Sequence, residues 1–239
     1  MSNILTLFKR EYAAYFNSPI AYIVVPVFLL VFGIFYWYVP DFFDVNQASM
    51  RRFFSMAPVV AAVFAPAITM RLIAEERKSG TLELLATLPF TDEDIVVGKY
   101  LAAFGLLLTA TALTLTYPLT VAYLGDLDWG PVVGGYLGFL LMGAAYLAIG
   151  TAASAVTSNQ IVAFFIALFV SVLVLLVDYV AYVVVPPSMM GVVEFLSFNF
   201  HFQNIAKGVI DSRDILFYFS VIWLCLGLAV HTLCRRRLS

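Results

Sequence analysis

Hydrophobic residues in this chain come in long continuous runs, each about as long as a helix that crosses a lipid bilayer. A hydrocarbon core of roughly 30 Å is spanned by about 20 residues of α-helix. The runs lack the alternation of apolar and polar residues that is typical of membrane β-barrel strands. We therefore predict an all-α membrane protein with six transmembrane helices, which cover approximately Ile20–Val39, Phe53–Ile73, Val97–Leu124, Val132–Thr157, Ile161–Val185 and Ile215–Leu233.

The composition excludes a soluble globular domain and several kinds of partner. Of the 239 residues, 63% are hydrophobic and 12% are charged, and the mean hydropathy is +0.97. The formal net charge of −2 and the absence of a basic stripe argue against nucleic acid as a partner. Cys225 and Cys234 lack the spacing of a metal site and are interpreted as small apolar residues. We expect residues 1–239 to form a single domain in the bilayer.

The distribution of lysine and arginine predicts the orientation of the spans. Cytoplasmic loops carry an excess of both residues. The six runs place four of these cations on one side, Arg51, Arg52, Lys207 and Arg213. We therefore expect a multi-pass protein of the cell (inner, cytoplasmic) membrane with both termini in the cytoplasm, on the side that receives the other nine, Lys9, Arg10, Arg71, Arg77, Lys78, Lys99, Arg235, Arg236 and Arg237.

Residues 1–18 precede the first run and predict an amphipathic helix. Thr6, Arg10 and Asn17 share one side of a helical wheel, and Ser18-Pro19 ends the helix. The opposite side holds Ile4, Leu5, Phe8, Tyr12, Tyr15 and Phe16. Two interpretations stay open: an anchor that lies on the cytoplasmic leaflet, or a lever that contacts a cytoplasmic partner.

Residues 71–99 form one dense polar connection between the second and third runs. Ten of the 28 charged residues lie in these 29 positions. We expect the second helix to continue past Arg71 and to break at Gly80, and a short helix from Thr81 to Leu88 to end at Pro89. Thr91 and Asp94 have the spacing of an N-cap and its N3 partner for the next helix. The connection is either a solvated loop or a docking knob with an apolar face made of Leu84, Leu85 and Leu88.

The segment EERKSGTLELLATLPFTDEDIVVGK, residues 75–99, resembles the first cytoplasmic loop of ABC-2-type permeases, the membrane subunits of ABC transporters. The match consists of Glu75-Glu76, Gly80-Thr81-Leu82-Glu83, Leu88-Pro89 and Gly98-Lys99 in this order. FKREYAAYFNSPIAY, from Phe8, is similar to the connecting helix of that family. HFQNIAKGVIDSRDILFYFS, from His201, resembles the branch of gliding-motility permeases and of permeases for nitrous-oxide-reductase maturation.

The resemblance implies which residues couple the chain to an ATPase. The helix Thr81–Leu88 would be the coupling helix that fits against a nucleotide-binding subunit. In the connecting helix, the implied residues are Phe8, Lys9, Arg10 and Tyr12. The coupling set implied in the polar connection is Glu75, Glu76, Arg77, Gly80, Thr81, Leu82, Glu83, Leu84, Leu85, Leu88 and Pro89.

The same resemblance implies a permease of an ATP-driven exporter. The chain has no G-x-x-x-x-G-K-[ST] motif, since Gly98-Lys99 is followed by Tyr100 and position 93 is Glu. We therefore expect it to bind no cofactor itself, with ATP and Mg²⁺ held by separate ABC ATPase subunits. A second permease copy or a relative would complete the pathway, with room for an accessory subunit on the outer side.

Three other functions are alternatives to a permease. A membrane scaffold or anchor subunit of a motility or maturation complex would present the same docking surface without moving a substrate. A passive channel is disfavoured because no span carries a regular set of polar residues. An intramembrane enzyme is disfavoured because His201 and His231 lie outside any catalytic motif.

The candidate pathway residues lie in the last third of the chain. Asp178 is an ionisable residue inside the fifth run, either at the outer interface or facing a pathway. We expect residues 186–214 to form short re-entrant helices broken near Gly208, which cap the pathway on the outside. The predicted outer gate consists of Phe198, Phe200 and Phe202, while His201 is expected to pack among them. The glycines of the fourth run are interpreted as helix-packing positions.

Overall fold

The computed structural model describes residues 3–38, 49–82, 89–184, 186, 190–209 and 211–237. Within these residues the fold is all-helical without strands, and six helices or helix pairs are long and apolar enough to cross a membrane, as predicted. These are α2 (Pro19–Trp37), α3 with α4 (Arg51–Thr69, Ala74–Ser79), α6 with α7 (Asp92–Leu113, Thr116–Leu124), α8 (Trp129–Val156), α9 (Gln160–Val184) and α12 (Ser212–Arg237). The remaining helices are α1 (Asn3–Asn17), α10 (Met190–Leu196) and α11 (Phe198–Ala206).

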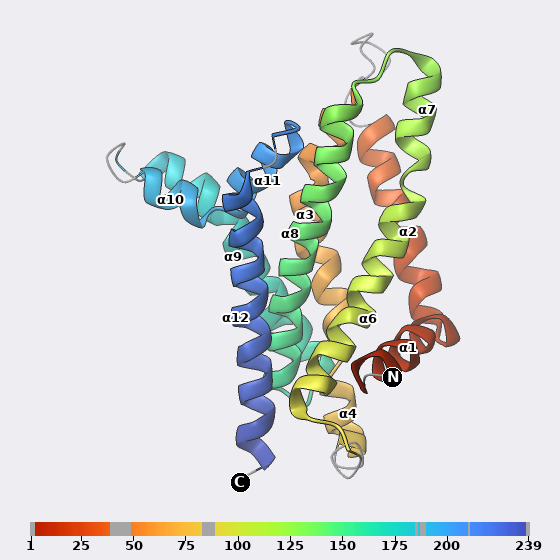
Figure 1. Cartoon of the computed structure of the whole chain (residues 1–239), viewed down its shortest axis with the longest axis vertical. Helices are drawn as coiled ribbons and strands as arrows, with labels where there is room; N and C mark the ends of the chain where they lie inside the picture. The colour runs from red at the N-terminus through yellow and green to blue at the C-terminus, as the bar shows by residue number, and fades with distance from the viewer. Residues whose placement is uncertain are drawn as a thin grey trace.

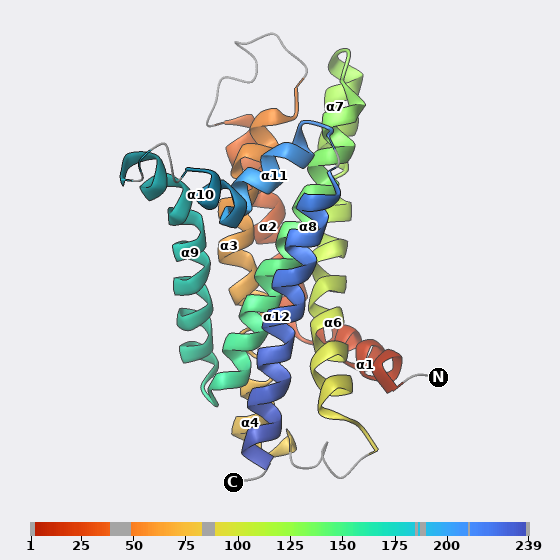
Figure 2. The same ribbon diagram turned by 60° about the vertical axis from the view of Figure 1, so that its left-hand side comes forward.

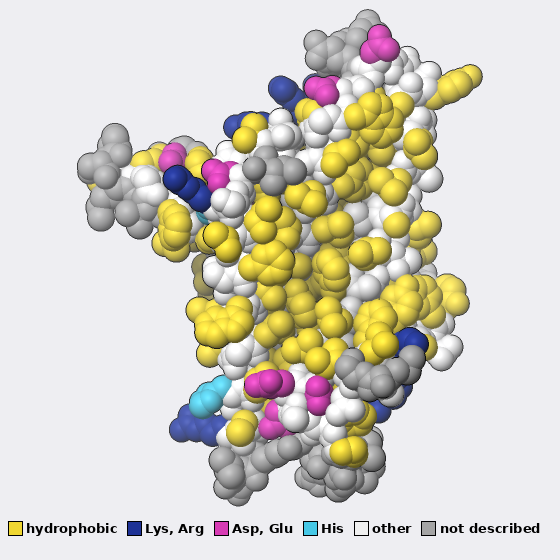
Figure 3. Space-filling model, in the orientation of Figure 1, with side chains coloured by type: hydrophobic (Ala, Val, Ile, Leu, Met, Phe, Trp, Pro, Cys, Tyr) yellow, Lys and Arg dark blue, Asp and Glu magenta, His cyan; other side chains and the backbone are white. Residues whose placement is uncertain are grey.

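Helix α8 is the centre of the bundle. Most of its residues are buried, and it packs against α3, α6, α9, α11 and α12. Few residues of α9 and α12 are buried, so their outer faces are available to lipid or to another subunit. Helix α4 lies at one end of the bundle and the tip of α7 at the other (Figures 1 and 2). A broad apolar surface separates charged side chains at the two ends, as expected for a protein that spans a bilayer (Figure 3).

The glycines of α8 allow neighbouring helices to approach closely, which confirms their interpretation as packing positions. A Cβ atom on Gly150 would collide with the hydroxyl of Thr69 on α3, and one on Gly135 would collide with the ring of Phe54. Between these two positions on α8, a Cβ on Gly143 would lie 2.6 Å from Cδ2 of Leu107 on α6. Small residues therefore let α3 and α6 pack directly against the central helix.

The third span is divided into α6 and α7 by a turn at Thr114 and Leu115. Pro118 lacks an N–H group, so it cannot donate to the carbonyl of Thr114 four residues earlier. That carbonyl instead accepts from the N–H of Tyr117 at 3.0 Å and from the hydroxyl of Tyr136 on α8, also at 3.0 Å. A side chain of α8 therefore stabilises this kink in the third span.

The segment between the fifth and sixth spans forms two short helices, as predicted. Helix α11 packs against α8, and α10 extends sideways from the bundle in both Figure 1 and Figure 2. Gly208 follows α11 with φ of 87°, a left-handed conformation that favours glycine. The expected break near Gly208 is therefore confirmed.

Candidate functional site

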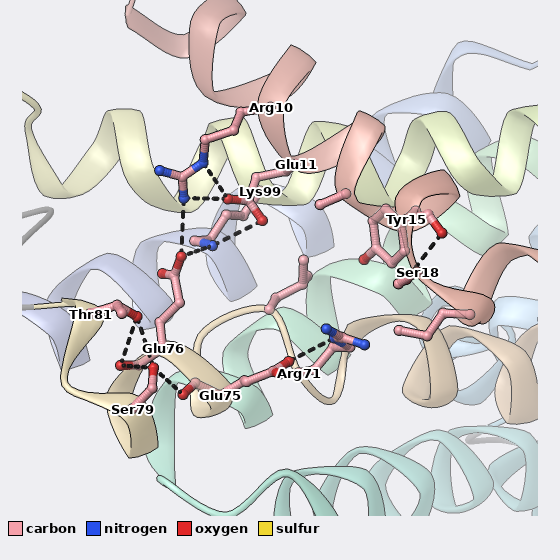
Figure 4. A pocket seen from close by; sticks show the side chains of 13 residues that line it. Arg10, Glu11, Tyr15, Ser18, Arg71, Glu75, Glu76, Ser79, Thr81 and Lys99 are labelled. Atoms are coloured by element: carbon pink, nitrogen blue, oxygen red, sulfur yellow. Dashed lines mark hydrogen bonds and ion pairs between the residues drawn. The ribbon is translucent and has the colours of Figure 1, made fainter.

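Three helices meet at the α4 end of the bundle: α4 and the start of α6, and α1 from the other end of the sequence. Between them lies a cavity of about 300 Å³. Figure 4 shows its side chains, which converge from α1, from the end of the second span and from α6. The cavity is lined by Arg10, Glu11, Ala14, Tyr15, Ser18, Ile20, Arg71, Leu72, Glu75, Glu76, Ser79, Thr81 and Lys99.

Four charged side chains form a continuous network in this cavity. Nζ of Lys99 on α6 lies 2.8 Å from Oε1 of Glu76 on α4 and 3.2 Å from Oε2 of Glu11 on α1. Nη2 of Arg10 lies 2.6 Å from Oε1 of Glu11 and 3.2 Å from Oε1 of Glu76. We call these four residues the junction network. The network holds three helices together. Because it consists of two carboxylates and two cations, it has no net formal charge.

The charged groups of the junction network other than Arg10 are largely buried, so each depends on its partners to offset the cost of leaving water. The side chain of Lys99 is 1% exposed, although a buried lysine is costly unless it is paired. Burial also disfavours the charged form of Glu11. The charges of Lys99 and Arg10 outweigh that effect, and the pKa of Glu11 is lowered from its ordinary value of 4.5. Glu11 is therefore held as a carboxylate between Arg10 and Lys99.

Helix α1 is packed against α6, and this position follows from two glycines. A Cβ atom on Gly98 would lie 2.8 Å from Cβ of Leu7, and one on Gly105 would lie 3.1 Å from the ring of Tyr12. The hydroxyl of Tyr12 also forms a 2.8 Å hydrogen bond with Thr109. Leu7 is buried, although the predicted apolar face of α1 omitted it. The connecting helix is thus a packed part of the bundle.

The second span is interrupted where it reaches this cavity. We expected the second helix to continue past Arg71 and to break at Gly80. The span does reach Ser79 and end at Gly80, as predicted, but it is not one continuous helix, because α3 ends at Thr69 and α4 begins at Ala74. The hydroxyl of Ser154 on α8 accepts from the N–H groups of Ile73 and Ala74, both at 3.1 Å, and donates to the carbonyl of Met70 at 3.2 Å. One buried side chain therefore satisfies three backbone groups that the break exposes.

The two flanks of the predicted coupling helix are attached to this site. Glu83, Leu84, Leu85 and Leu88 lie outside the described residues. On the first flank, Gly80 ends α4 with φ of 74°, and the hydroxyl of Thr81 donates to the carbonyl of Glu76 at 3.3 Å. On the second, the carbonyl of Pro89 accepts from the side-chain amide of Asn3 on α1 at 2.9 Å.

The start of α6 has the capping arrangement that the sequence predicts. The hydroxyl of Thr91 accepts from the N–H of Asp94, and the carboxylate of Asp94 accepts from the N–H of Thr91, both at 3.1 Å. This capping box fixes where α6 begins. It therefore sets the position of Lys99, two turns farther along the same helix.

The other predicted coupling residues surround the junction network. Glu75 is exposed and pairs with Arg71 at 2.7 Å, one turn earlier. Arg77 is half-buried on α4, and Leu82 is partly buried against the core. Lys9 is exposed on α1 beside Phe8, which packs against the core. Glu11 and Lys99 complete the network but were absent from the predicted site. Lys99 was noted only as part of a motif, and Glu11 could have been found as the acid on the side of α1 that also carries Leu7.

The predicted pathway residues lie near the opposite end. Phe198 and Phe202 on α11 are buried inside the subunit, whereas Phe200 is exposed. Phe202 packs against α8 at Gly138. Asp178 belongs to α9. Their role as an outer gate stays a prediction.

A protein-family model described as "ABC-2 family transporter protein" matches residues 8–232. The match extends from α1 to α12 and includes all four residues of the junction network. No curated protein matches the chain.

Proposed function

This chain belongs to the ABC-2 family of transporter proteins, and we propose that its junction network passes movement from a separate ATPase into the transmembrane helices. As a member of the family it is a multi-pass membrane permease component, and the family implies an ATPase partner. The network then explains how a short cytoplasmic segment would act on several spans at once.

One observation carries this proposal: residues 83–88 are flanked on both sides by contacts to the same three-helix junction. Thr81 contacts the backbone of Glu76, and Pro89 contacts Asn3 of α1. Glu76 is in turn paired with Arg10 of α1 and Lys99 of α6. A force applied to the segment is thus delivered to α1, α4 and α6 together.

The proposed orientation places the α4 end in the cytoplasm, where the ATPase is located. Nine of the 13 lysine and arginine residues belong to this side when the predicted spans are used. Helices α10 and α11 then lie on the outer side. The mechanism is a rigid-body tilt of the junction helices when two ATPases approach one another, which opens or closes a central path for export.

A second permease, a copy or a relative, would form the other half of that path. The support is the exposed apolar faces of α9 and α12, since few of their residues are buried within this chain. The cytoplasmic or inner membrane is the proposed location. A relation to the gliding-motility or nitrous-oxide-reductase-maturation branch rests on the His201–Ser220 segment alone.

Copurification tests the coupling role. The tagged chain is purified from its native cells in mild detergent, and the proteins that accompany it are identified by mass spectrometry. We expect a P-loop ATPase at about equal stoichiometry, lost in Leu84→Glu and retained in the matched control Glu93→Gln on exposed α6 surface. Normal ATPase recovery with Leu84→Glu would contradict the coupling role.

ATP turnover by the purified complex separates a transporter from a scaffold. Transport predicts that some exported compound stimulates turnover, and that Leu84→Glu abolishes the stimulation. A complex that hydrolyses ATP at one rate with every compound offered, and moves none of them into vesicles, would favour the scaffold or anchor function instead.

A further inference from the structure

His201 on α11 and Asp214 on α12 form a buried pair at the end of the bundle opposite α4. Nδ1 of His201 lies 2.6 Å from Oδ1 of Asp214, and the two residues are 4% and 3% exposed. The other ring nitrogen, Nε2, lies 3.0 Å from the carbonyl oxygen of Phe195 on α10. One imidazole therefore connects three helices, α10, α11 and α12.

The donor and acceptor roles in these contacts indicate how many protons the pair carries. A neutral imidazole has one N–H donor and one nitrogen that only accepts, while a carboxylate and a carbonyl are acceptors. With either neutral tautomer beside a carboxylate, a nitrogen lone pair would face an oxygen lone pair. Two protons on the pair remove this conflict: an imidazolium donates to both oxygens, or a protonated Asp214 donates to Nδ1 while Nε2–H donates to Phe195.

The surroundings of the pair are aromatic. The imidazole stacks on the ring of Phe217, with centroids 4.1 Å apart, and the rings of Phe195, Phe200 and Tyr218 are also close. Oδ2 of Asp214 is buried without a hydrogen-bond partner. With two protons the pair is neutral, whereas with one it places an uncompensated negative charge among aromatic rings, which is costly.

Other titratable groups lie on the helices around the pair. The hydroxyl of Tyr218 donates to the carbonyl of Phe198 at 2.7 Å. Within the described part of the chain, no third charged side chain joins the ion pair. The helices packed against it carry further ionisable residues, among them Asp178, Tyr179 and Tyr182 on α9, Tyr136 and Tyr146 on α8, Arg51 and Arg52 on α3, Glu194 on α10, Lys207 after α11, and Asp211 and Arg213 around the start of α12.

We propose that His201 and Asp214 form a proton-binding site that fastens α10 and α11 to the start of the last span. With the second proton bound, both ring nitrogens are satisfied and the three helices are held together. Loss of that proton as the pH rises leaves one ring N–H, which stays on the Asp214 carboxylate because a charged acceptor binds it more strongly, so the contact to Phe195 on α10 is lost. Helix α10 is then released, while α11 stays on α8 through Phe202, which packs against Gly138.

Spin-label distances in the purified full chain test this site. Labels replace Leu196 on α10 and Leu216 on α12, both exposed, after Cys225 and Cys234 are changed to serine. Distances are compared at roughly pH 5 and roughly pH 9, on either side of the range in which histidine usually changes charge. We expect one narrow distance distribution at the lower pH and an added, longer population at the higher pH.

Asp214→Asn is the matched variant. Its side-chain amide can donate to Nδ1 while a neutral Nε2–H donates to Phe195, so the helices stay fastened without the second proton. We expect the narrow distribution at both pH values. Identical wild-type distributions at both pH values, or a pH-dependent Asp214→Asn protein, would overturn the proposal.

Nuclear magnetic resonance supplies a second measurement that needs no variant of the pair. In a His231→Gln protein, His201 is the one histidine left. Ring ¹⁵N and aspartate ¹³C resonances at the lower pH then count the protons on the pair. Two N–H groups on the His201 ring, or one N–H and a protonated Asp214 carboxyl, support the site. A single proton on the pair contradicts it, and this result does not depend on whether Asp214→Asn folds.

Discussion

The ε-ammonium of Lys99 lies 2.8 Å from Oε1 of Glu76, and this contact joins α6 directly to α4. The two helices are the immediate neighbours of residues 83–88 in the chain. Because Glu11 of α1 pairs with the same ammonium, a displacement of that segment either moves α1, α4 and α6 together or breaks the network. The geometry is thus suited to carry a rigid-body movement into the bilayer.

Replacing Lys99 by methionine should strongly destabilise the junction. The change keeps most of the apolar stem but removes the buried cation that Glu11 and Glu76 share, which leaves them the half-exposed Arg10, and breaking a buried pair costs about 3–5 kcal/mol. We expect a clear decrease in the melting temperature of the detergent-solubilised protein. Lys78→Met, at an exposed position of α4, is the control and should be neutral. Equal melting temperatures for the two variants would show that the pair contributes nothing.

Two glycine substitutions test whether α1 is held by close packing. In Gly98→Ala the new Cβ would lie 2.8 Å from Cβ of Leu7, so α1 must shift away from α6, at a cost of about 1–3 kcal/mol. Gly227→Ala on α12 meets no atom within 4 Å and should be neutral or stabilising. Thermal unfolding of both variants measures the difference. A Gly98→Ala protein as stable as Gly227→Ala would mean that α1 is loosely attached.

The spans were predictable from the sequence because their signal is local. An apolar run of about 20 residues has few structures available in a bilayer besides a helix. The capping box of Thr91 and Asp94 was predictable for the same reason, since its partners are three residues apart. The kink near Pro118 follows from a missing N–H group. Each of these features depends on neighbours in the chain.

The junction network and the helix break depend on distant neighbours, which explains why they were missed. Glu11 and Lys99 are 88 positions apart, and only the packing of α1 on Gly98 brings them together. The break after Thr69 is stabilised by Ser154, whose sequence context is a run of small residues. The local sequence could mark Glu11 as an acid on the Leu7 side of α1 and Lys99 as part of a motif, but it could not show that the two side chains meet.

Removing the hydroxyl of Ser154 should weaken the break between α3 and α4. Ser154→Ala leaves two N–H groups and one carbonyl without this partner in a buried place, and an unsatisfied buried group costs about 1–3 kcal/mol. We expect faster hydrogen exchange at Ile73 and Ala74, measured by mass spectrometry, and a lower melting temperature. Ser220→Ala removes an exposed hydroxyl from α12 and is the matched control. Unchanged exchange at the break would rule out this role of Ser154.

Acid should release α1 from the bundle through Glu11. Its pKa is lowered in the folded protein, so the carboxylate adds stability that is fully present above the ordinary value of 4.5 and is lost as the pH falls through the lower folded value. Spin labels at exposed Ala13 on α1 and Leu108 on α6 should therefore report one distance at neutral pH and a broader distribution well below 4.5. Glu11→Gln removes this titration, so the variant should show weaker α1 contact at neutral pH and a smaller change in acid. Glu93→Gln, an exposed acid of α6, should keep the wild-type transition. If Glu11→Gln instead keeps the full acid transition, the proton acts elsewhere, and Glu76, which shares Lys99 and Arg10, is the next carboxylate to change.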